Sequence, residues 1–141
     1  GAGSNCPAAP RDSVVQIPSE MVSGEPEYLT RDALERFTRL HNAAKADGVT
    51  ILVSDGWRSE EEQVYLYNKY KGKSAVATPC SLGGGGSNHN SGVAVDLEIG
   101  CAKTDSSCNS RAYNWMKENG GEYGFNNVLP RDTVHWSPTG R

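Results

Sequence analysis

Residues 87–96 read SNHNSGVAVD and place His89 seven positions before Asp96. The end of this stretch continues as an alternating apolar run, which predicts a strand over 93–97 with its valines and leucine on one face and Asp96 on the other. A carboxylate on a short apolar strand is costly to bury without a partner or a metal ion. We therefore expect the fold to bring a partner to Asp96.

A second histidine, His135, is the candidate for that partner. Residues 132–136 read DTVHW, and the chain has only three histidines in all. His89, Asp96 and His135 together offer two imidazoles and one carboxylate, a set suited to catalytic zinc with a fourth position open to water. Spacing alone leaves a chance occurrence equally open. The third histidine, His41, falls on the flank of a predicted helix and is expected to be structural or exposed.

Length and charge restrict the class of protein. The chain of 141 residues is long enough for one domain with a real core, and its 14 basic and 17 acidic residues give a formal net charge of −3. This weak acidity argues against a nucleic-acid partner, because phosphate binding requires a basic face. No run of 18 apolar residues is present, so no membrane span is expected. Nothing in the sequence demands an oligomer, and we expect a monomer.

The chain has four cysteines, and they predict disulfides. No two of them form a Cys-x-x-Cys pair, which disfavours a structural zinc knuckle. An even count in a small domain indicates an oxidising, secreted or extracytoplasmic setting, although four free thiols in a cytosolic protein are the alternative. Of three possible connectivities we favour Cys101–Cys108, which closes a short loop, and Cys6–Cys80, which would tether the N-terminus.

The remaining pattern predicts an N-terminal arm over residues 1–29 that wraps a domain over 30–141, with a brief strand at 14–17. Apolar spacing and capping residues predict three helices, and β-branched runs predict strands. The expected helices cover about 31–46, 60–71 and 111–119, and the expected strands cover 49–53, 93–97 and 133–136. The four glycines at 83–86 are expected to form a flexible flap or an inserted loop beside the metal site.

Two further side chains are candidates for chemistry. Arg58 follows a predicted strand and precedes a helix, a junction where working groups are often placed, although an ion pair with Glu60–Glu62 is an equal alternative. Asp132 supplies a second carboxylate near His135, and its alternative role is that of a turn residue after Pro130.

The order of these motifs along the chain favours a metal site over a chance occurrence of the three residues. Over residues 50–140, the chain resembles the zinc D-alanyl-D-alanine carboxypeptidase and L-alanyl-D-glutamate endolysin peptidase family. The resemblance implies a hedgehog/DD-peptidase-like α+β fold, with a small central antiparallel sheet and helices packed on one side. The motifs that carry it are Trp57-Arg58-Ser59 with Gln63, Ser87-x-His89-x-x-Gly92-x-Ala94-x-Asp96, Tyr123-Gly124-Phe125 and His135-Trp136.

The resemblance also implies roles for individual residues. It makes His89, Asp96 and His135 the ligands of one zinc ion, and it makes Asp132 the catalytic base that acts on a zinc-bound water. It places Arg58 at the substrate carbonyl or carboxylate, with Ser87 and Gln63 along the substrate groove.

The implied reaction is hydrolysis of a peptide bond in a peptidoglycan stem peptide. The carboxypeptidase branch usually carries glutamate three residues before the last histidine, and Asp132 looks more like the endopeptidase branch, so both reactions stay open. A domain that holds zinc without catalysis and binds cell wall or a protein partner, as related hedgehog signalling domains suggest, is the alternative.

Overall fold

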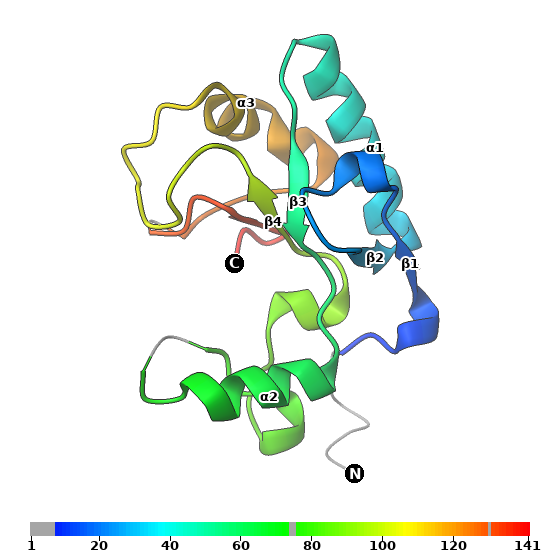
Figure 1. Cartoon of the computed structure of the whole chain (residues 1–141), viewed down its shortest axis with the longest axis vertical. Helices are drawn as coiled ribbons and strands as arrows, with labels where there is room; N and C mark the ends of the chain where they lie inside the picture. Colours follow the sequence, from blue (N-terminus) through cyan, green and yellow to red (C-terminus); the bar gives the residue numbers. More distant parts are fainter. Residues whose placement is uncertain (1–7, 74–75, 130) are drawn as a thin grey trace.

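The central sheet has three short antiparallel strands: β3 (Leu52–Asp55), β4 (Val95–Glu98) and β5 (His135–Trp136), in the order β3-β4-β5. The computed structural model describes residues 8–73, 76–129 and 131–141. Asp96 of β4 lies opposite Asp55 on one side and His135 on the other, with a register shift between Val53 and Asp55. The sheet therefore aligns two of the predicted metal ligands across neighbouring strands (Figure 1).

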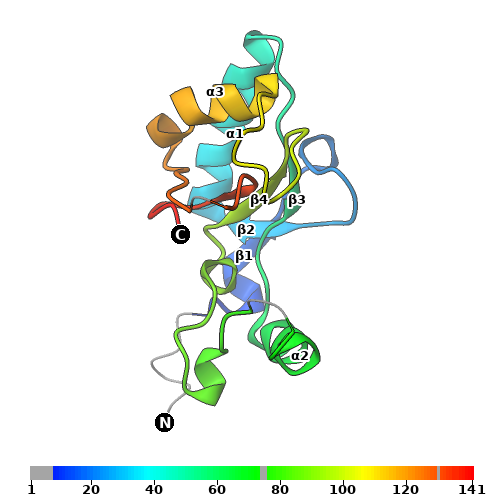
Figure 2. The same cartoon turned by 90° about the vertical axis from the view of Figure 1, so that its left-hand side faces the viewer.

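Two helices cover the apolar face of this sheet. They are α1 (Arg31–Ala46) and α3 (Arg111–Asn119), and Figure 2 shows both on the same side of β3 and β4. Thr30 caps α1 by accepting a hydrogen bond from the Ala33 N–H, and Ser110 caps α3 in the same way. These bounds confirm the first and third predicted helices and the α+β fold with a small antiparallel sheet.

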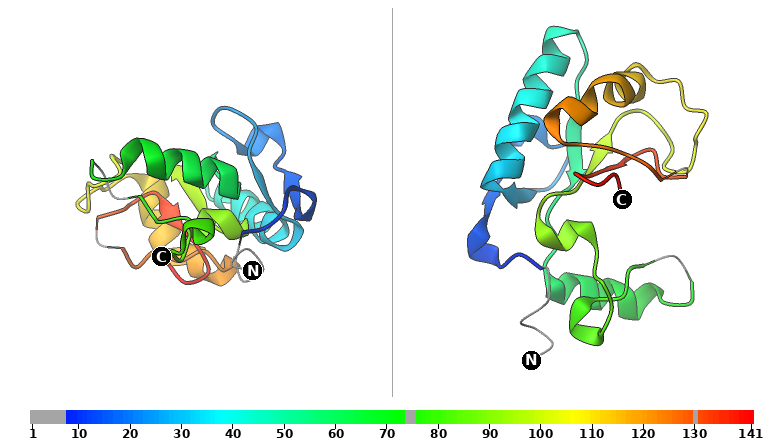
Figure 3. Two further views of the ribbon diagram at one scale, coloured as in Figure 1. Left: turned by 90° about the horizontal axis from the view of Figure 1, so that it is seen from below. Right: turned by 180° about the vertical axis from the view of Figure 1, so that it is seen from behind.

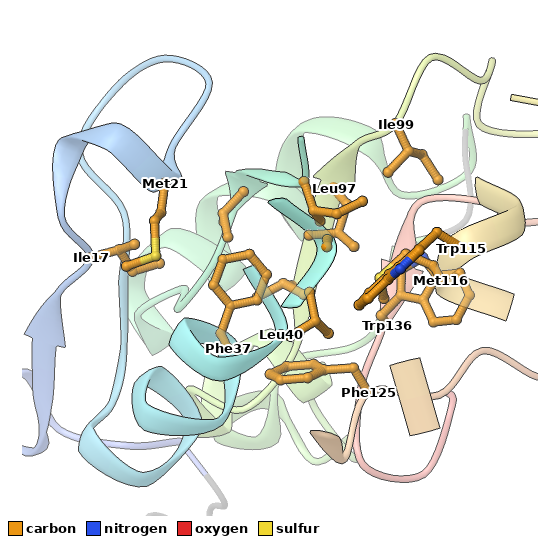
Figure 4. Packing of buried hydrophobic residues seen from close by; sticks show 14 of the residues in the cluster. Ile17, Met21, Phe37, Leu40, Leu97, Ile99, Trp115, Met116, Phe125 and Trp136 are labelled. Carbon is orange, nitrogen blue, oxygen red and sulfur yellow. The ribbon is translucent and has the colours of Figure 1, made fainter. Parts of the chain in front are cut away.

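The core lies between the two helices and the sheet (Figure 4). Phe37 and Leu40 of α1 are fully buried, as spacing at helical periodicity predicts. Phe37 packs edge-on against Phe125, with ring centroids 5.9 Å apart. Leu97 of β4 and Met116 of α3 complete the contact between the layers, which fixes the strand that carries Asp96.

The remaining helix, α2 (Glu60–Tyr70), stands apart from the other two. Figure 1 and the right panel of Figure 3 show it at the opposite end of the molecule from α3. Ser59 caps it by accepting from the Glu62 N–H. The helix matches the predicted range of about 60–71.

The N-terminal segment packs onto the same body. Strand β1 (Val14–Gln16) pairs antiparallel with β2 (Tyr28–Thr30), which confirms the predicted brief strand. Ile17 and Leu29 are fully buried in the common core. Two single-turn 3-10 helices, Arg11–Ser13 and Ser19–Met21, complete this segment. The boundary at residue 29 between an arm and a domain stays a prediction.

The three strands of the central sheet all have ends that differ from the sequence prediction. The middle one was expected at 93–97, but β4 spans Val95–Glu98. The first was expected at 49–53, but pairing occurs at 52–55, because the partner strand β4 lies opposite only from Leu52 onward. The last was expected at 133–136, but Thr133 donates its N–H to Lys103 O instead of to a neighbouring strand, so β5 begins at His135. For the first and last strands, the tertiary partner sets the strand end.

The loops also test the cysteine and glycine predictions. Cys101 and Cys108 form the predicted disulfide, with Cα atoms 5.7 Å apart. Cys6 lies outside the described residues, so the pairing predicted for it stays a prediction. In the glycine-rich loop, the N–H of Gly84 donates to Pro79 O and that of Gly86 to Thr78 O, so the run begins and ends in hydrogen-bonded turns. Within the described ranges, no helix combines the length and apolar character that a membrane crossing needs.

Candidate metal centre

Three side chains from three separate elements meet at one point. His89 comes from the 3-10 helix η5 (Asn88–Ser91), Asp96 from β4 and His135 from β5. The Nε2 atom of His89, the Oδ1 atom of Asp96 and the Nδ1 atom of His135 are each 3.2 Å from the other two. The fold thus brings together all three residues that the sequence singles out as ligands.

The spacing of these atoms fits a small divalent ion. A tetrahedral zinc ion about 2.0–2.1 Å from each ligand would separate the ligand atoms by about 3.3–3.4 Å. The observed 3.2 Å is close to that value, and each of the three atoms carries a lone pair when His89 is protonated only at Nδ1 and His135 only at Nε2. Both imidazoles are buried, whereas Asp96 is partly exposed, so the triangle is open on one side.

The tautomer of His89 is set by its neighbour. His89 Nδ1 lies 2.8 Å from Gly56 O, and because a carbonyl oxygen only accepts, Nδ1 must carry the proton. Nε2 is then left unprotonated and faces Asp96. The N–H of Gly56 in turn donates to Glu27 Oε1 at 2.9 Å, and burial raises the pKa of Glu27 despite that bond. A ligand oriented by a hydrogen bond through its other nitrogen is typical of metal centres.

The electrostatics of the triangle favour positive charge. Burial raises the pKa of Asp96, but hydrogen bonds with His135 and His89 outweigh it and hold the pKa well below its ordinary range. Burial lowers the pKa of His135, but the hydrogen bond with Asp96 and one with the backbone of Arg141 raise it above its ordinary value. The ionised carboxylate therefore draws a cation, whether a proton or a metal ion, to this point.

The triangle forms one wall of a pocket of about 370 Å³ between α2 and the sheet. Its lining includes every residue that the sequence predicts for metal binding, catalysis and substrate contact. The lining residues are Arg58, Gln63, Leu66, Tyr70, Val76, Ala77, Ser87, His89, Asp96, Lys103, Leu129, Asp132 and His135.

Arg58 is held rigidly at the entrance to α2. One terminal nitrogen donates to Asp55 Oδ2 at 2.7 Å, and the other donates to Gln63 Oε1 at 3.0 Å. Gln63 is fully buried and donates in turn to Ala77 O. The alternative ion pair with Glu60–Glu62 is wrong, because Asp55 at the end of β3 takes that place. A direct contact of Gln63 with substrate stays a prediction.

Backbone bonds join the Arg58 segment to the His89 segment. The N–H of Arg58 donates to His89 O, and the buried amide of Asn90 donates to the carbonyls of Arg58 and Ser59. Ser87 accepts from the His89 N–H and donates its own N–H to Asn90 Oδ1. Ser87 therefore shapes the turn that presents His89 as well as lining the pocket.

Asp132 sits directly beside the triangle. Its Oδ1 accepts from the N–H groups of Val134 and His135 at 3.2 and 3.0 Å, so this oxygen has the turn-forming role that was its alternative. Its Oδ2 is 4.0 Å from Lys103 Nζ and takes no part in that turn. Asp132 thus lines the pocket with Oδ1 hydrogen-bonded to the backbone and Oδ2 available to a ligand.

Sequence reasoning missed several residues that position this site. Asp55 and Glu27 belong to none of the motifs in the sequence, yet they orient Arg58 and Gly56. Lys103 lies in a polar disulfide loop with no motif of its own. Glu27 and Lys103 act through contacts over long separations in the chain, whereas Asp55 lies only three residues before Arg58 but belongs to no motif.

Comparisons with known proteins agree with this geometry. A family model described as D-alanyl-D-alanine carboxypeptidase, VanY, matches residues 26–137. The chain belongs to the VanY D-alanyl-D-alanine carboxypeptidase family. A relative, the D-alanyl-D-alanine carboxypeptidase of Enterococcus faecalis, is 31% identical over 104 residues, or 66% of this chain. The chain spans only 38% of the length of that relative.

Solved structures share the fold of this chain. An LD-carboxypeptidase, LdcB, described for its peptidoglycan recognition, has a TM-score of 0.74 at 22% identity and covers 93% of this chain and 70% of its own. A vancomycin-resistance D,D-pentapeptidase VanY in complex with Zn(II) has a TM-score of 0.59 at 24% identity, over 86% of this chain and 82% of its own. At these identities the likeness shows the shared fold.

Proposed function

We propose that this protein is a zinc-dependent peptidase that hydrolyses peptide bonds in peptidoglycan stem peptides. The observation that carries the proposal is the triangle of donor atoms from His89, Asp96 and His135, each 3.2 Å from the others, in an open pocket. Membership of the VanY family and the Zn(II) complex of a D,D-pentapeptidase with this fold support the metal and the substrate class.

The residues around the triangle suit hydrolysis. A zinc ion bound there would polarise the scissile carbonyl and acidify a water molecule. Asp132 accepts the proton of the attacking water at Oδ2, because Oδ1 is engaged by two backbone N–H groups, and it passes that proton to the leaving amine. Arg58, fixed by Asp55 and Gln63, donates a remaining N–H to the substrate carbonyl oxygen as negative charge develops.

Two observations bear on the alternatives. A domain that only holds zinc has no need of a carboxylate with an available oxygen and a rigidly held guanidinium in the same pocket, so we favour catalysis. We also propose an extracytoplasmic location, supported by the Cys101–Cys108 disulfide. The monomeric state expected from the sequence stays a prediction.

Digestion of purified cell wall with metal-free and zinc-restored protein tests the proposal. We expect His89→Ala to lose both zinc, measured by metal analysis, and cleavage. Asp132→Asn should keep zinc but lose turnover, because an amide still accepts the two backbone bonds but cannot take a proton. Undiminished hydrolysis after verified metal removal would overturn the proposal. Mass spectrometry of the products separates loss of a terminal residue from release of an internal amine.

A further inference from the structure

Lys103 is a second cation in the pocket, and the fold holds its backbone in place. It belongs to the loop closed by the Cys101–Cys108 disulfide. Thr133, which is buried, donates its N–H to Lys103 O at 2.8 Å, and its hydroxyl lies 3.0 Å from Ala102 O. The same strand segment that presents His135 therefore also sets the position of residue 103 at the rim of the pocket.

The two cations of the pocket differ in how far their charge is already satisfied. Arg58 is 17% exposed and 2.7 Å from the carboxylate of Asp55, so its charge is largely compensated. The Lys103 side chain is 66% exposed, and its Nζ is 4.0 Å from Asp132 Oδ2, at the limit of an ion pair. Because the lysine stem is flexible, the exposed ammonium of Lys103 can turn toward an anionic ligand.

The position of Lys103 relative to Asp132 decides which part of a substrate it meets. A general base that returns its proton to the leaving amine must reach that nitrogen. The Asp132 side of the pocket is therefore the side of the leaving residue, and Lys103 lines the pocket next to Asp132, with its Nζ 4.0 Å from Asp132 Oδ2. In an α-amino acid the amine and the carboxylate are attached to one carbon, so a terminal carboxylate would fall close to Lys103.

We propose that Lys103 binds the free α-carboxylate of the leaving residue and so makes the enzyme select peptides that end at that residue. The inference rests on the proposed peptidase function. It deepens that function by favouring removal of a single terminal amino acid over cleavage within a chain. Arg58 then contacts the substrate carbonyl oxygen. This role suits a guanidinium whose position is fixed by Gln63 and whose charge is largely compensated by Asp55.

Matched peptides test the role of Lys103. The probes are acetyl-L-lysyl-D-alanyl-D-alanine and the same peptide with a C-terminal amide, and the readout is the ratio of kcat/KM for acid over amide. Because both peptides use the same base, any effect of a substitution on Asp132 cancels in this ratio. We expect Lys103→Ala to lower the ratio about fivefold, as for one partly exposed charge-assisted contact. Lys103→Arg should keep most of it.

The control is Lys45→Ala, which removes an exposed lysine in the last turn of α1 and should leave the ratio unchanged. An unchanged ratio in Lys103→Ala, with the wild-type preference intact, overturns the inference. If neither the wild type nor any variant turns over either peptide, the proposed function fails. Lys103 is then tested by binding: calorimetry on zinc-loaded protein gives the Kd for each peptide, and Lys103→Ala should reduce the preference for the acid over the amide in the same way. Equal binding of acid and amide by the wild-type protein would also overturn it.

Discussion

Gly56 connects the N-terminal segment to the metal ligands, and replacing it with alanine should weaken both folding and zinc binding. A Cβ atom at this position would lie 2.6 Å from Tyr28 O, closer than real Cβ contacts come, and the obstacle is backbone of β2 rather than a mobile side chain. The Gly56 N–H donates to Glu27, and its carbonyl accepts from His89. Any movement that relieves the clash also moves the group that orients His89.

The size of the effect follows from these two contacts. Forcing an extra methyl group into a packed site costs about 1–3 kcal/mol of unfolding free energy. Loss of the hydrogen bond that orients a metal-ligating histidine lowers metal affinity by about 10–100-fold. For Gly56→Ala we therefore expect the metal-free protein to be less stable by about 1–3 kcal/mol and the zinc affinity to fall by one to two orders of magnitude.

Urea denaturation of the metal-free protein measures the first effect, and competition with a chromophoric zinc chelator measures the second. The matched control is Gly85→Ala, because a Cβ atom there meets nothing within 4 Å and the backbone is not in the left-handed region. We expect its stability to stay within about 0.5 kcal/mol of wild type. Wild-type stability and zinc affinity in Gly56→Ala would refute the reasoning that this peptide unit positions His89.

Three other outcomes are expected. In the metal-free protein, the free energy of unfolding contributed by protonated His135 should be lost as the pH rises from about 6.5 through the raised pKa of this residue. Zinc affinity, measured by titration, should increase over the same pH range, because the proton on His135 competes with the metal. The opposite trend in metal-free protein would show that Asp96 does not stabilise the charged imidazole. The pair Cys101→Ser and Cys108→Ser should lower the unfolding free energy, measured in urea, by about 2.5 kcal/mol, from the entropy of an eight-residue loop. Arg58→Lys should lower kcat in a peptide hydrolysis assay by about 10²–10³-fold without unfolding the protein. The reason is that a lysine cannot bridge Asp55 and Gln63 and still face the substrate. A kcat near that of the wild type would show that Arg58 takes no part in the reaction.

The helices were predictable because their signals are local. Thr30 and Ser59 accept capping hydrogen bonds at the starts of α1 and α2, and the apolar side chains of Phe37 and Leu40, at helical spacing, face the core. The ends of the strands were not predictable at the same accuracy. Strand β3 begins at Leu52 because its partner β4 lies opposite from that point, and pairing between strands depends on segments far apart in the chain.

The candidate site divides in the same way. Residue type made His89, Asp96 and His135 candidate ligands, and the resemblance of the ordered motifs to a zinc peptidase family implied that set and the roles of Asp132 and Arg58. The sequence by itself therefore determined the donor set and the helical framework of this protein.

Only the tertiary structure decided the positions and orientations of those groups. It placed Gly56 O against His89, Asp55 against Arg58, and Lys103 beside Asp132. Each of these contacts joins groups whose individual propensities say nothing about one another, and their distances arise from the packing of α1, α3 and the sheet. A ligand set is a property of the residues, whereas the separation and orientation of its atoms are properties of the packed core that holds them.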